Sequence, residues 1–323
     1  MKLIIIFFAF LFSSASLFGC SSDNKEKEEP GNETVEAVKV IFDTDMCFDV
    51  DDVGALAILH AYADKGEAQI VAICYNEVHK DGVAAIDAIN TWYGRGNIPI
   101  GIYKKPLSEP DHSSYLTDVA AFPNDIPADK SKIPSALYTY IDALSSQPDN
   151  SVVIISVGFL NNLRELLDND KELVRRKVKK LVVMGGINND DFNFIRHNLV
   201  SDTEKVLRDW PTPIVITQLG GNVLTGECLK NASDNPVKEA YYKWFGDKFE
   251  GRSSWDAYAV LYAIRGTDLF KEEYTGSGSL KNGYSFDMEK GYRYYITSAL
   301  SDAEYKYIIE EMMMRMPKHL INN

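Results

Sequence analysis

Short apolar runs alternate with amphipathic segments along most of this chain. Runs rich in Val and Ile have the length of buried strands, and segments with apolar residues at helical spacing lie between them. The pattern predicts strands at 38–42, 69–75, 98–102, 151–156, 180–184 and 213–217, and helices at 52–64, 83–93, 135–146, 160–167 and 202–210. Continuous apolar strands separated by helices are typical of a mainly parallel sheet flanked by helices. We therefore expect an α/β, Rossmann-like fold.

The C-terminal part of the chain has a different pattern. Helical spacing dominates there, at 237–248, 255–265 and 303–314. A hairpin is predicted between Tyr284 and Thr297. Earlier, the connection 104–130 is longer than compact folds usually leave without a function. Ligands of parallel α/β sheets bind outside the carboxyl ends of the strands, so we expect binding and catalytic residues directly after the predicted strands.

Residues 1–19 have the pattern of a secretory signal peptide. Lys2 precedes an apolar run that is too short to cross a bilayer, and small residues follow it. The segment ends in Leu-Phe-Gly-Cys, which resembles a bacterial lipobox, so we expect lipid on Cys20; the alternative is a cleaved signal with an unmodified cysteine. Residues 20–37 are polar and charged and predict a flexible tether ahead of a folded domain at 38–323.

These N-terminal features predict a protein of the bacterial cell envelope that is anchored to a membrane by lipid. The acidic start of the tether also resembles a surface-export signal, although a solvated linker has the same composition. If Cys20 carries lipid, Cys47, Cys74 and Cys228 remain, and this odd number argues against a fully paired set of disulfides. The formal net charge of −13 argues against nucleic acid as a partner, because binding its backbone requires a basic face.

The most informative segment is the acidic turn between the first predicted strand and the first predicted helix. It contains Asp43, Asp45, Asp49, Asp51 and Asp52. Carboxylates this close repel one another, and burial raises the cost further. A helix start accommodates Asp51 and Asp52, because free backbone N–H groups there favour negative charge. It does not account for Asp43 and Asp45, whereas a hard divalent cation would, so we predict a cation site.

Several further motifs follow this turn in order along the chain. The turn itself reads Asp-Thr-Asp-Met-Cys-Phe-Asp-Val-Asp-Asp. The later motifs are Tyr75-Asn76, the stretch 88–101, Ser156 to Asn162, Met184-Gly-Gly, Asp191-Phe-Asn193, Trp210-Pro-Thr-Pro and Gly251 to Tyr262. From about residue 38 onward this ordered set resembles the nucleoside hydrolase family. The resemblance implies that family's α/β fold and hydrolysis of the N-glycosidic bond of ribonucleosides or a related ribosyl compound.

The resemblance also implies a role for each matched residue. In the family, one Ca²⁺ holds a water and two ribose hydroxyls; here Asp45, Asp52, Asp256 and the Val157 carbonyl would be its protein ligands. Asp45, touching that water, would be the general base. The residues implied in substrate binding are Asp51, Asn76, Asp191, Asn193 and Trp255. Family members commonly form dimers or tetramers, which implies a homo-oligomer.

Five positions depart from the family's pattern, and two of them, Val157 in place of Thr and Asp191 in place of Glu, keep the oxygen that the family uses. Cys47 replaces a glycine where the backbone passes close to metal and sugar, and Phe48 replaces a polar residue. Trp255 stands where many members have a proton-donating His, so either an aromatic ring stacks on the base instead or another group protonates the base. Arg196 and His197 follow the Asn193 turn, where they either reach a ligand or lie in a solvated loop.

Three other hypotheses therefore remain beside hydrolysis. The first is a non-catalytic or repurposed envelope lipoprotein of the same fold that binds sugars or nucleosides. The second is a haloacid-dehalogenase-like phosphatase, because a strand followed by Asp43-Thr-Asp45 resembles its nucleophile motif. The third is a structural lipoprotein. The phosphatase gives no role to Asp256, and the structural hypothesis leaves the clustered aspartates unexplained.

Overall fold

The computed structural model describes residues 36–127, 129–185, 192–273, 277–279, 285–287 and 293–321. By internal contacts, Glu36–Asn323 form one compact unit. The predicted signal peptide, Cys20 and nearly all of the predicted tether lie outside the described residues, and so does Asp191. Within the described ranges, no helix has both the length and the apolar character needed to cross a membrane.

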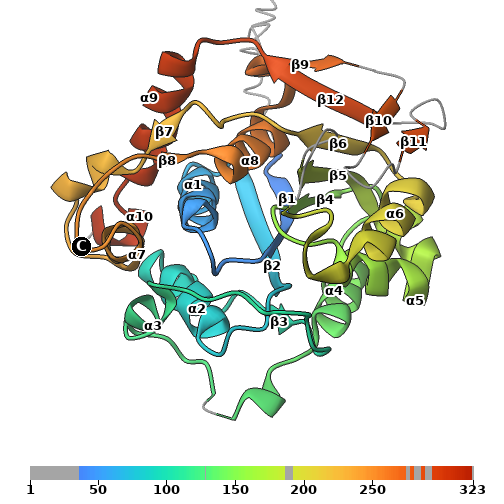
Figure 1. The fold of residues 1–323 in the computed structure, drawn as a ribbon, viewed down its shortest axis with the longest axis horizontal. Coiled ribbons are helices and arrows are strands. Elements are labelled where there is room, and N and C mark those ends of the chain that lie inside the picture. The colour runs from blue at the N-terminus through green and yellow to red at the C-terminus, as the bar shows by residue number, and fades with distance from the viewer. Residues whose placement is uncertain are drawn as a thin grey trace, which may run out of the picture. The chain divides into compact units, whose positions relative to one another are not determined.

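An eight-stranded sheet runs through the middle of the domain in the order β3-β2-β1-β4-β5-β6-β12-β9 (Figure 1). Its strands are β1 (Val38–Thr44), β2 (Ala68–Tyr75), β3 (Ile100–Ile102), β4 (Val152–Ser156), β5 (Val178–Met184), β6 (Ile214–Thr217), β9 (Phe270–Glu273) and β12 (Arg293–Ser298). Neighbouring strands from β3 to β12 are parallel, and β9 runs antiparallel to β12 at the edge. The predicted mainly parallel sheet is therefore confirmed.

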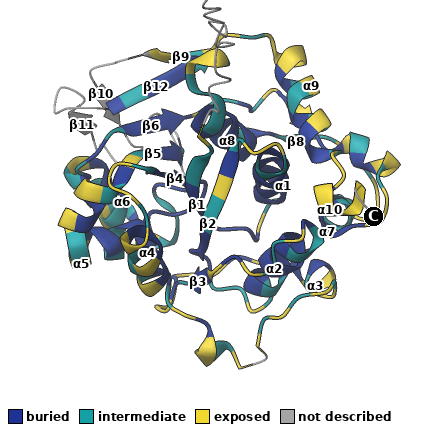
Figure 2. Cartoon of the chain, turned by 180° about the vertical axis from the view of Figure 1, so that it is seen from behind, coloured by how far each residue is buried: buried dark blue, intermediate teal, exposed yellow. Residues whose placement is uncertain are grey.

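Helices cover both faces of this sheet. The longer ones are α1 (Asp51–Asp64), α2 (Gly82–Trp92), α4 (Ala136–Ser145), α5 (Asn161–Lys177), α6 (Val200–Asp209), α7 (Pro236–Trp244), α8 (Trp255–Arg265) and α9 (Asp302–Met313). In Figure 1, α4, α5 and α6 lie on one side of the sheet, and α1 and α8 lie on the other. Figure 2 shows the sheet and α1 buried, with exposed residues on the outer surfaces of α5 and α9.

The alternation of side chains along β1 explains this layered arrangement. Val40 and Phe42 pack in the core on the α1 and α8 side, whereas Ile41 packs in the core on the α4 to α6 side. Successive side chains of a strand point to opposite faces, so a strand buried on both faces must be apolar throughout. The continuous apolar runs that predicted parallel strands thus have a direct physical cause.

Two predicted elements differ from the structure. The helix predicted at 160–167 continues as α5 to Lys177, because the helix resumes after a kink at Asp170. The predicted hairpin between Tyr284 and Thr297 is wrong: β12 instead completes the large sheet against β6 and β9. The first part of that region forms β11 (Ser285–Asp287), which pairs with β10 (Ser277–Ser279). Burial of Tyr295 and Ile296 in the two cores favours this long-range pairing over a local turn.

The carboxyl ends of four strands meet at one edge of the sheet. Thr44 of β1 pairs with Tyr75 of β2, Asp43 pairs with Ser156 of β4, and Ser156 pairs with Val183 of β5. In parallel strands this register brings the residues that follow each strand to the same place. Asp45, Asn76, Val157 and Gly185 therefore leave the sheet side by side, where α/β folds bind ligands.

Candidate functional site

Four buried carboxyl groups gather at this edge from two distant parts of the chain. Asp45 follows β1, Asp51 and Asp52 begin α1, and Asp256 lies in the first turn of α8, which packs against α1. All four residues are between 1% and 5% exposed. Burial raises the pKa of each carboxyl group, and the charges of Asp51, Asp52 and Asp45 raise the pKa of Asp256 further. We call these four residues the acidic cluster.

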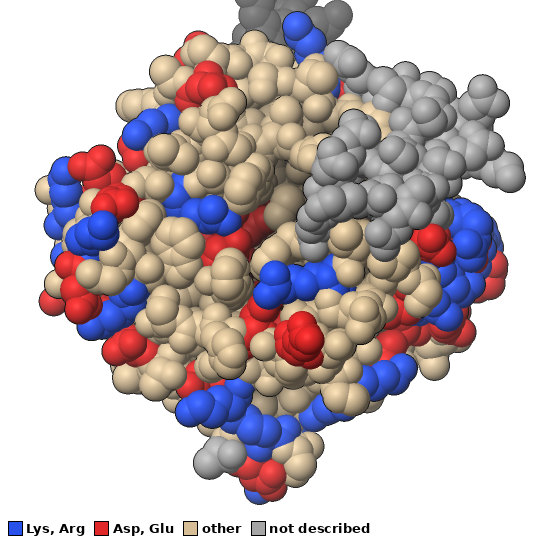
Figure 3. All heavy atoms as spheres, in the orientation of Figure 1, with Lys and Arg blue, Asp and Glu red and all other residues tan. Residues whose placement is uncertain are grey.

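Hydrogen bonds and one guanidinium hold the acidic cluster in place. The Thr44 hydroxyl donates to Asp52. Arg252 donates from Nε to Asp51 at 3.2 Å and from Nη2 to Asp49 at 2.7 Å. Burial and the charge of Asp49 raise the pKa of Asp51 to about 8, although Arg252 opposes this rise. Figure 3 shows acidic atoms at the bottom of a hollow with basic groups at its rim.

One fully buried oxygen of the cluster has no hydrogen-bond partner among the described residues. Asp256 Oδ1 is buried and accepts no hydrogen bond. Buried polar atoms in native proteins are almost always paired, so an unpartnered carboxylate oxygen points to a ligand, an ion or water. The donor set consists of carboxylate and carbonyl oxygens, and this is the set that Ca²⁺ and Mg²⁺ take in proteins. The residues present therefore fit a hard divalent cation.

Asp43 lies in the same acidic turn but in a different environment. Its carboxylate accepts hydrogen bonds from Asn76, from the Tyr140 hydroxyl at 2.7 Å and from Asn162 at 3.2 Å. Burial raises its pKa to about 7, against the effect of these three donors. With its oxygens bound internally and no exposed surface, Asp43 is unsuited to act as the nucleophile of a phosphatase.

Two buried amides present acceptors beside the acidic cluster. Asn76 donates to Asp43 and to the Phe159 carbonyl, and Asn193 donates to the Val157 carbonyl at 2.8 Å. In both residues Oδ1 is buried without a partner, which leaves it able to accept a hydrogen bond from a ligand. A carbonyl oxygen has two lone pairs, so Val157 keeps one acceptor site beside its bond to Asn193.

Aromatic rings and Arg252 form one wall of the rim. The Arg252 guanidinium lies 4.6 Å from the Trp255 ring centroid and 5.3 Å from that of Trp244. The Trp244 indole donates to the Phe48 carbonyl at 2.9 Å, and the Phe48 side chain is half exposed. Cys47, in contrast, packs fully buried in the apolar core, and burial raises its pKa. Cys47, Cys74 and Cys228 are all free thiols.

A second polar group lies next to the amides. His197 Nε2 is 3.6 Å from Glu77 Oε2 and 3.5 Å from Asp111 Oδ2, and all three side chains are at most 4% exposed. Within the described part of the chain, this is the group of His, Cys, Asp or Glu side chains whose ligand atoms all lie within 4.8 Å of one another. The acidic cluster does not meet that spacing. The possibility that His197 lies in a solvated loop is excluded.

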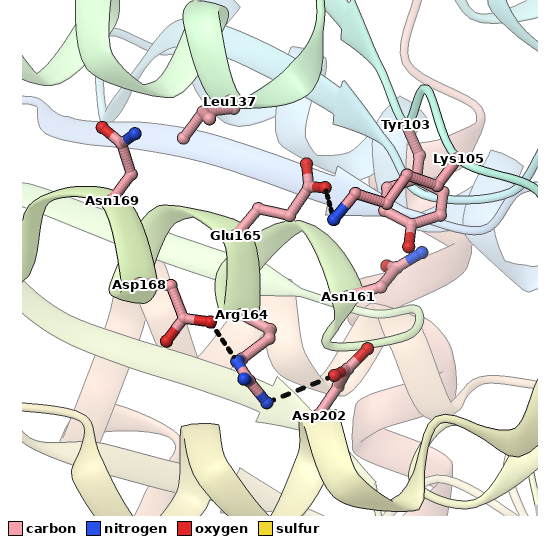
Figure 4. A pocket seen from close by; sticks show the side chains of 9 residues that line it. All are labelled: Tyr103, Lys105, Leu137, Asn161, Arg164, Glu165, Asp168, Asn169 and Asp202. Atoms are coloured by element: carbon pink, nitrogen blue, oxygen red, sulfur yellow. Dashed lines mark hydrogen bonds and ion pairs between the residues drawn. The ribbon is translucent and has the colours of Figure 1, made fainter.

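A polar surface depression of about 320 Å³ has Asn161 in its wall. Its lining residues are Tyr103, Lys105, Leu137, Asn161, Arg164, Glu165, Asp168, Asn169 and Asp202. Figure 4 shows that its charged groups pair with one another, Lys105 with Glu165 and Arg164 with Asp168 and Asp202. Because these charges are already neutralised, we interpret the depression as a surface ion-pair network.

Sequence reasoning missed three charged residues of this edge. Arg252 lies inside the matched motif 251–262, but nothing in the pattern indicated that it would pair with Asp49 and Asp51. Glu77 directly follows Asn76 at a strand end, which was a usable signal. Asp111 lies in the long connection 104–130, and the length of that connection was the only indication of a role.

Solved structures with a similar fold include nucleoside hydrolases. A purine-preferring ribonucleoside hydrolase from Gardnerella vaginalis has a TM-score of 0.64 at 16% identity, covering 87% of this chain and 99% of that chain. A plant nucleoside hydrolase has a TM-score of 0.60 at 13% identity, with coverages of 86% and 99%. An inosine-guanosine nucleoside hydrolase has a TM-score of 0.61 at 17% identity, with coverages of 85% and 98%. At these identities the likeness establishes the fold.

The sequence establishes the family. The sequence model of the inosine-uridine preferring nucleoside hydrolases matches residues 40–291, which is most of the folded domain. The chain therefore belongs to this family, whose members are metal-dependent and hydrolyse N-glycosyl compounds, and it is an enzyme of that class. A search of curated protein sequences found no match. The predicted family and the predicted fold class are both confirmed.

Proposed function

We propose that this enzyme is a calcium-dependent nucleoside hydrolase that cleaves ribonucleosides or a related ribosyl compound. One observation carries the proposal: Asp45, Asp51, Asp52 and Asp256 share one buried cluster at the carboxyl edge of the sheet. Buried like charges destabilise one another, and a divalent cation with carboxylate ligands offsets that cost. Asp45, Asp52, Asp256 and the Val157 carbonyl would hold Ca²⁺.

The residues of the site suit this reaction. When bound, the cation would hold two sugar hydroxyls and lower the pKa of a water positioned to attack C1′. Asp45 would accept a proton from that water and so act as the general base. Asp51 and the Oδ1 atoms of Asn76 and Asn193 accept hydrogen bonds from sugar hydroxyls. The negative charge of the cluster stabilises oxocarbenium-like character on the sugar as the base departs.

The remaining assignments concern the base and the rest of the sugar. Trp255 has no side-chain group that can transfer a proton to the departing base, so we assign it to stacking on the base. Its ring, with Arg252 and Trp244, forms a wall of the rim suited to a planar aromatic ligand. Asp191, in the Asp-Phe-Asn motif, is assigned to a sugar hydroxyl.

The test is a panel of ribonucleosides assayed for release of reducing sugar with and without Ca²⁺. We expect a chelator to abolish release from at least one substrate. Asp52→Ala should lower kcat/KM about 1,000-fold or more, since a metal ion supplies several kcal/mol of transition-state stabilisation. The matched control is Asp234→Ala, because the Asp234 side chain is 98% exposed and lies outside the cluster.

Calorimetric titration with the same nucleosides separates this proposal from its alternative. Binding by the wild-type protein without any release of sugar would contradict hydrolysis. That outcome would favour a repurposed envelope lipoprotein of the same fold that binds nucleosides or other sugars.

We also propose that the chain is a lipoprotein of the bacterial envelope, lipidated on Cys20. The apolar run, the lipobox-like Leu-Phe-Gly-Cys and the polar residues 20–37 support this assignment. The wild-type protein should fractionate with membranes when expressed in a bacterium with a lipoprotein-processing pathway, and Cys20→Ser should not. Equal membrane association of both forms would contradict lipid anchoring. Light scattering on the purified protein tests the expected homo-oligomer.

A further inference from the structure

A candidate second metal centre lies beside the sugar site. We propose that Glu77, Asp111 and His197 bind a first-row divalent cation of the zinc type, separate from the calcium ion assigned to the acidic cluster. The three residues come from the end of β2, from the connection 104–130 and from the 3-10 turn η2 (Arg196–Asn198). The proposal rests on side-chain geometry and does not depend on the reaction proposed above.

The spacing of the three ligand atoms suits a shared ion better than direct hydrogen bonds. His197 Nε2 lies 3.6 Å from Glu77 Oε2 and 3.5 Å from Asp111 Oδ2. These distances are longer than ordinary N–H···O hydrogen bonds, which are about 2.7–3.2 Å. Two ligands at about 2.0–2.2 Å from one zinc ion, separated by roughly tetrahedral to trigonal angles, lie about 3.3–3.7 Å apart.

The outer contacts of His197 fix which ring nitrogen faces the centre. His197 Nδ1 lies 2.6 Å from the Ser108 carbonyl, which can only accept a hydrogen bond, so Nδ1 carries a proton. Arg196 Nε donates to His197 Nε2 at 3.3 Å, so the Nε2 lone pair accepts from Arg196 in this structure, and an ion would take the place of that long contact. A histidine that donates Nδ1–H to a backbone carbonyl has the tautomer of a metal ligand, with Nε2 as the coordinating atom.

Each carboxylate is likewise held through one oxygen, and its other oxygen faces the centre, where Glu77 Oε2 also accepts a long hydrogen bond of 3.5 Å from the Asp111 backbone N–H. Glu77 Oε1 accepts from the Val78 backbone N–H at 2.6 Å, and Asp111 Oδ1 accepts from Arg196 Nη2. The second oxygens, Glu77 Oε2 and Asp111 Oδ2, face His197. Arg196 offsets one of the two negative charges, and a proton on His197, whose pKa Asp111 and Glu77 raise against the effect of burial, would offset the other. A bound cation would take the place of that proton and balance the same charge.

The ligand types select among cations. Imidazole nitrogen with carboxylate oxygen suits zinc and its first-row neighbours, whereas calcium prefers oxygen alone.

The proposed zinc centre lies next to Asn76, one of the two amides assigned to sugar binding. Glu77 directly follows Asn76 in the chain. The ring centroids of His197 and Phe159 lie 4.6 Å apart in an edge-to-face arrangement, and the Phe159 carbonyl accepts a hydrogen bond from Asn76. An ion here would fasten three loops around the sugar site.

The experiment is titration of Zn²⁺ into the metal-free full chain, with Ca²⁺ present at saturation. The wild-type protein should bind one zinc ion per chain, and X-ray absorption should show nitrogen and oxygen ligands at about 2.0–2.2 Å with an imidazole contribution. His197→Ala and, separately, Glu77→Gln should weaken zinc binding about 100-fold or more, because loss of a ligand exceeds the effect of losing an outer contact.

Two matched controls keep the outcome interpretable. His112→Ala removes an exposed histidine next to Asp111 and should leave zinc binding unchanged. Asp52→Ala disrupts the proposed calcium site and should still bind the zinc ion. The zinc titration therefore tests the second centre independently of the calcium site. Circular dichroism checks that each variant is folded. If His197→Ala does not fold, Glu77→Gln alone provides the test of the ligand set. Absence of zinc binding, or equal binding by wild type and both ligand variants, would overturn the proposal.

Discussion

At the scale of single residues, hydrogen-bond donors divide the aspartates of one turn into two kinds. Asp43 receives three donors and has no exposed surface, so its charge is used inside the fold. Asp45 and Asp52, a few positions further along, lie among other carboxylates, and burial and mutual repulsion raise their pKa well above the usual range. Aspartate therefore has a structural role at position 43 and a candidate catalytic or metal-binding role at positions 45 and 52.

The support of Asp43 predicts a pH-dependent effect of Tyr140→Phe. Asp43 has a pKa raised from 3.8 to about 7 in the folded protein, so the protein loses stability as the pH rises between these two values. The Tyr140 hydroxyl opposes this cost by donating to the carboxylate. We expect Tyr140→Phe to lower the free energy of unfolding by about 1.5–3 kcal/mol at pH 8, and by less at pH 5, where Asp43 is protonated.

Denaturant unfolding at the two pH values measures this difference. Tyr138→Phe is the matched control, because Tyr138 lies on the same helix with its side chain exposed, and it should have little effect at either pH. An equal loss of stability at pH 5 and pH 8 for Tyr140→Phe would contradict the role assigned to Asp43.

At the scale of elements, the turns after the strands position the site. The turn between β4 and α5 passes so close to Asp45 and Asn76 that a side chain at Gly158 has no room. A Cβ atom there would lie 2.5 Å from the Asp45 backbone nitrogen and 2.6 Å from Asn76 Oδ1. The glycine thus permits the close approach of two strand ends that bear site residues.

Gly158→Ala should consequently disturb both stability and substrate binding. Overpacking of this kind costs about 1–3 kcal/mol, and relief of the contact must displace Asp45 or Asn76. We expect a lower melting temperature together with a raised KM for any ribonucleoside that the wild-type enzyme hydrolyses. Steady-state kinetics checks the second effect, and an unchanged KM in a destabilised protein would show that the turn does not position the site.

The elements also show where the local sequence pattern is enough to predict a strand or a helix. Every strand with a continuous apolar run was predicted, because burial on both faces leaves a signal that depends on the strand alone. The strand β9 was missed and β12 was assigned to a local hairpin, since their place at the end of the sheet depends on the long-range pairing of β12 with β6 and β9. The full length of α5 was also missed, because the polar residues around the kink at Asp170 interrupt the apolar spacing.

At the scale of the whole molecule, the acidic cluster joins segments about 200 residues apart, at the start of α1 and the start of α8. A cation that binds both segments in the folded state, and not in the unfolded chain, must stabilise the fold. The expected gain is about 2.7 kcal/mol at a calcium concentration 100 times the dissociation constant. Calcium should therefore raise the melting temperature, and a chelator should reverse the rise.

Thermal unfolding of Asp256→Asn provides the comparison. This variant removes the contribution of α8, so its melting temperature should respond little to calcium. Asp302→Asn is a suitable control, since Asp302 begins α9 as an exposed residue and should retain the full response. A wild-type melting temperature that does not change with calcium would count against the calcium site.

The sequence by itself determined the α/β architecture, the family, and the candidate residues that lie directly after strands. These properties follow from local periodicity and from motifs that occur in order along the chain. Only the tertiary structure decided that Arg252 pairs with Asp49 and Asp51, that Asp43 is enclosed by donors, and that His197 meets Glu77 and Asp111. The reason is physical: such contacts join residues between 33 and 203 positions apart. The chain pattern specifies which face is buried but not which side chains meet there.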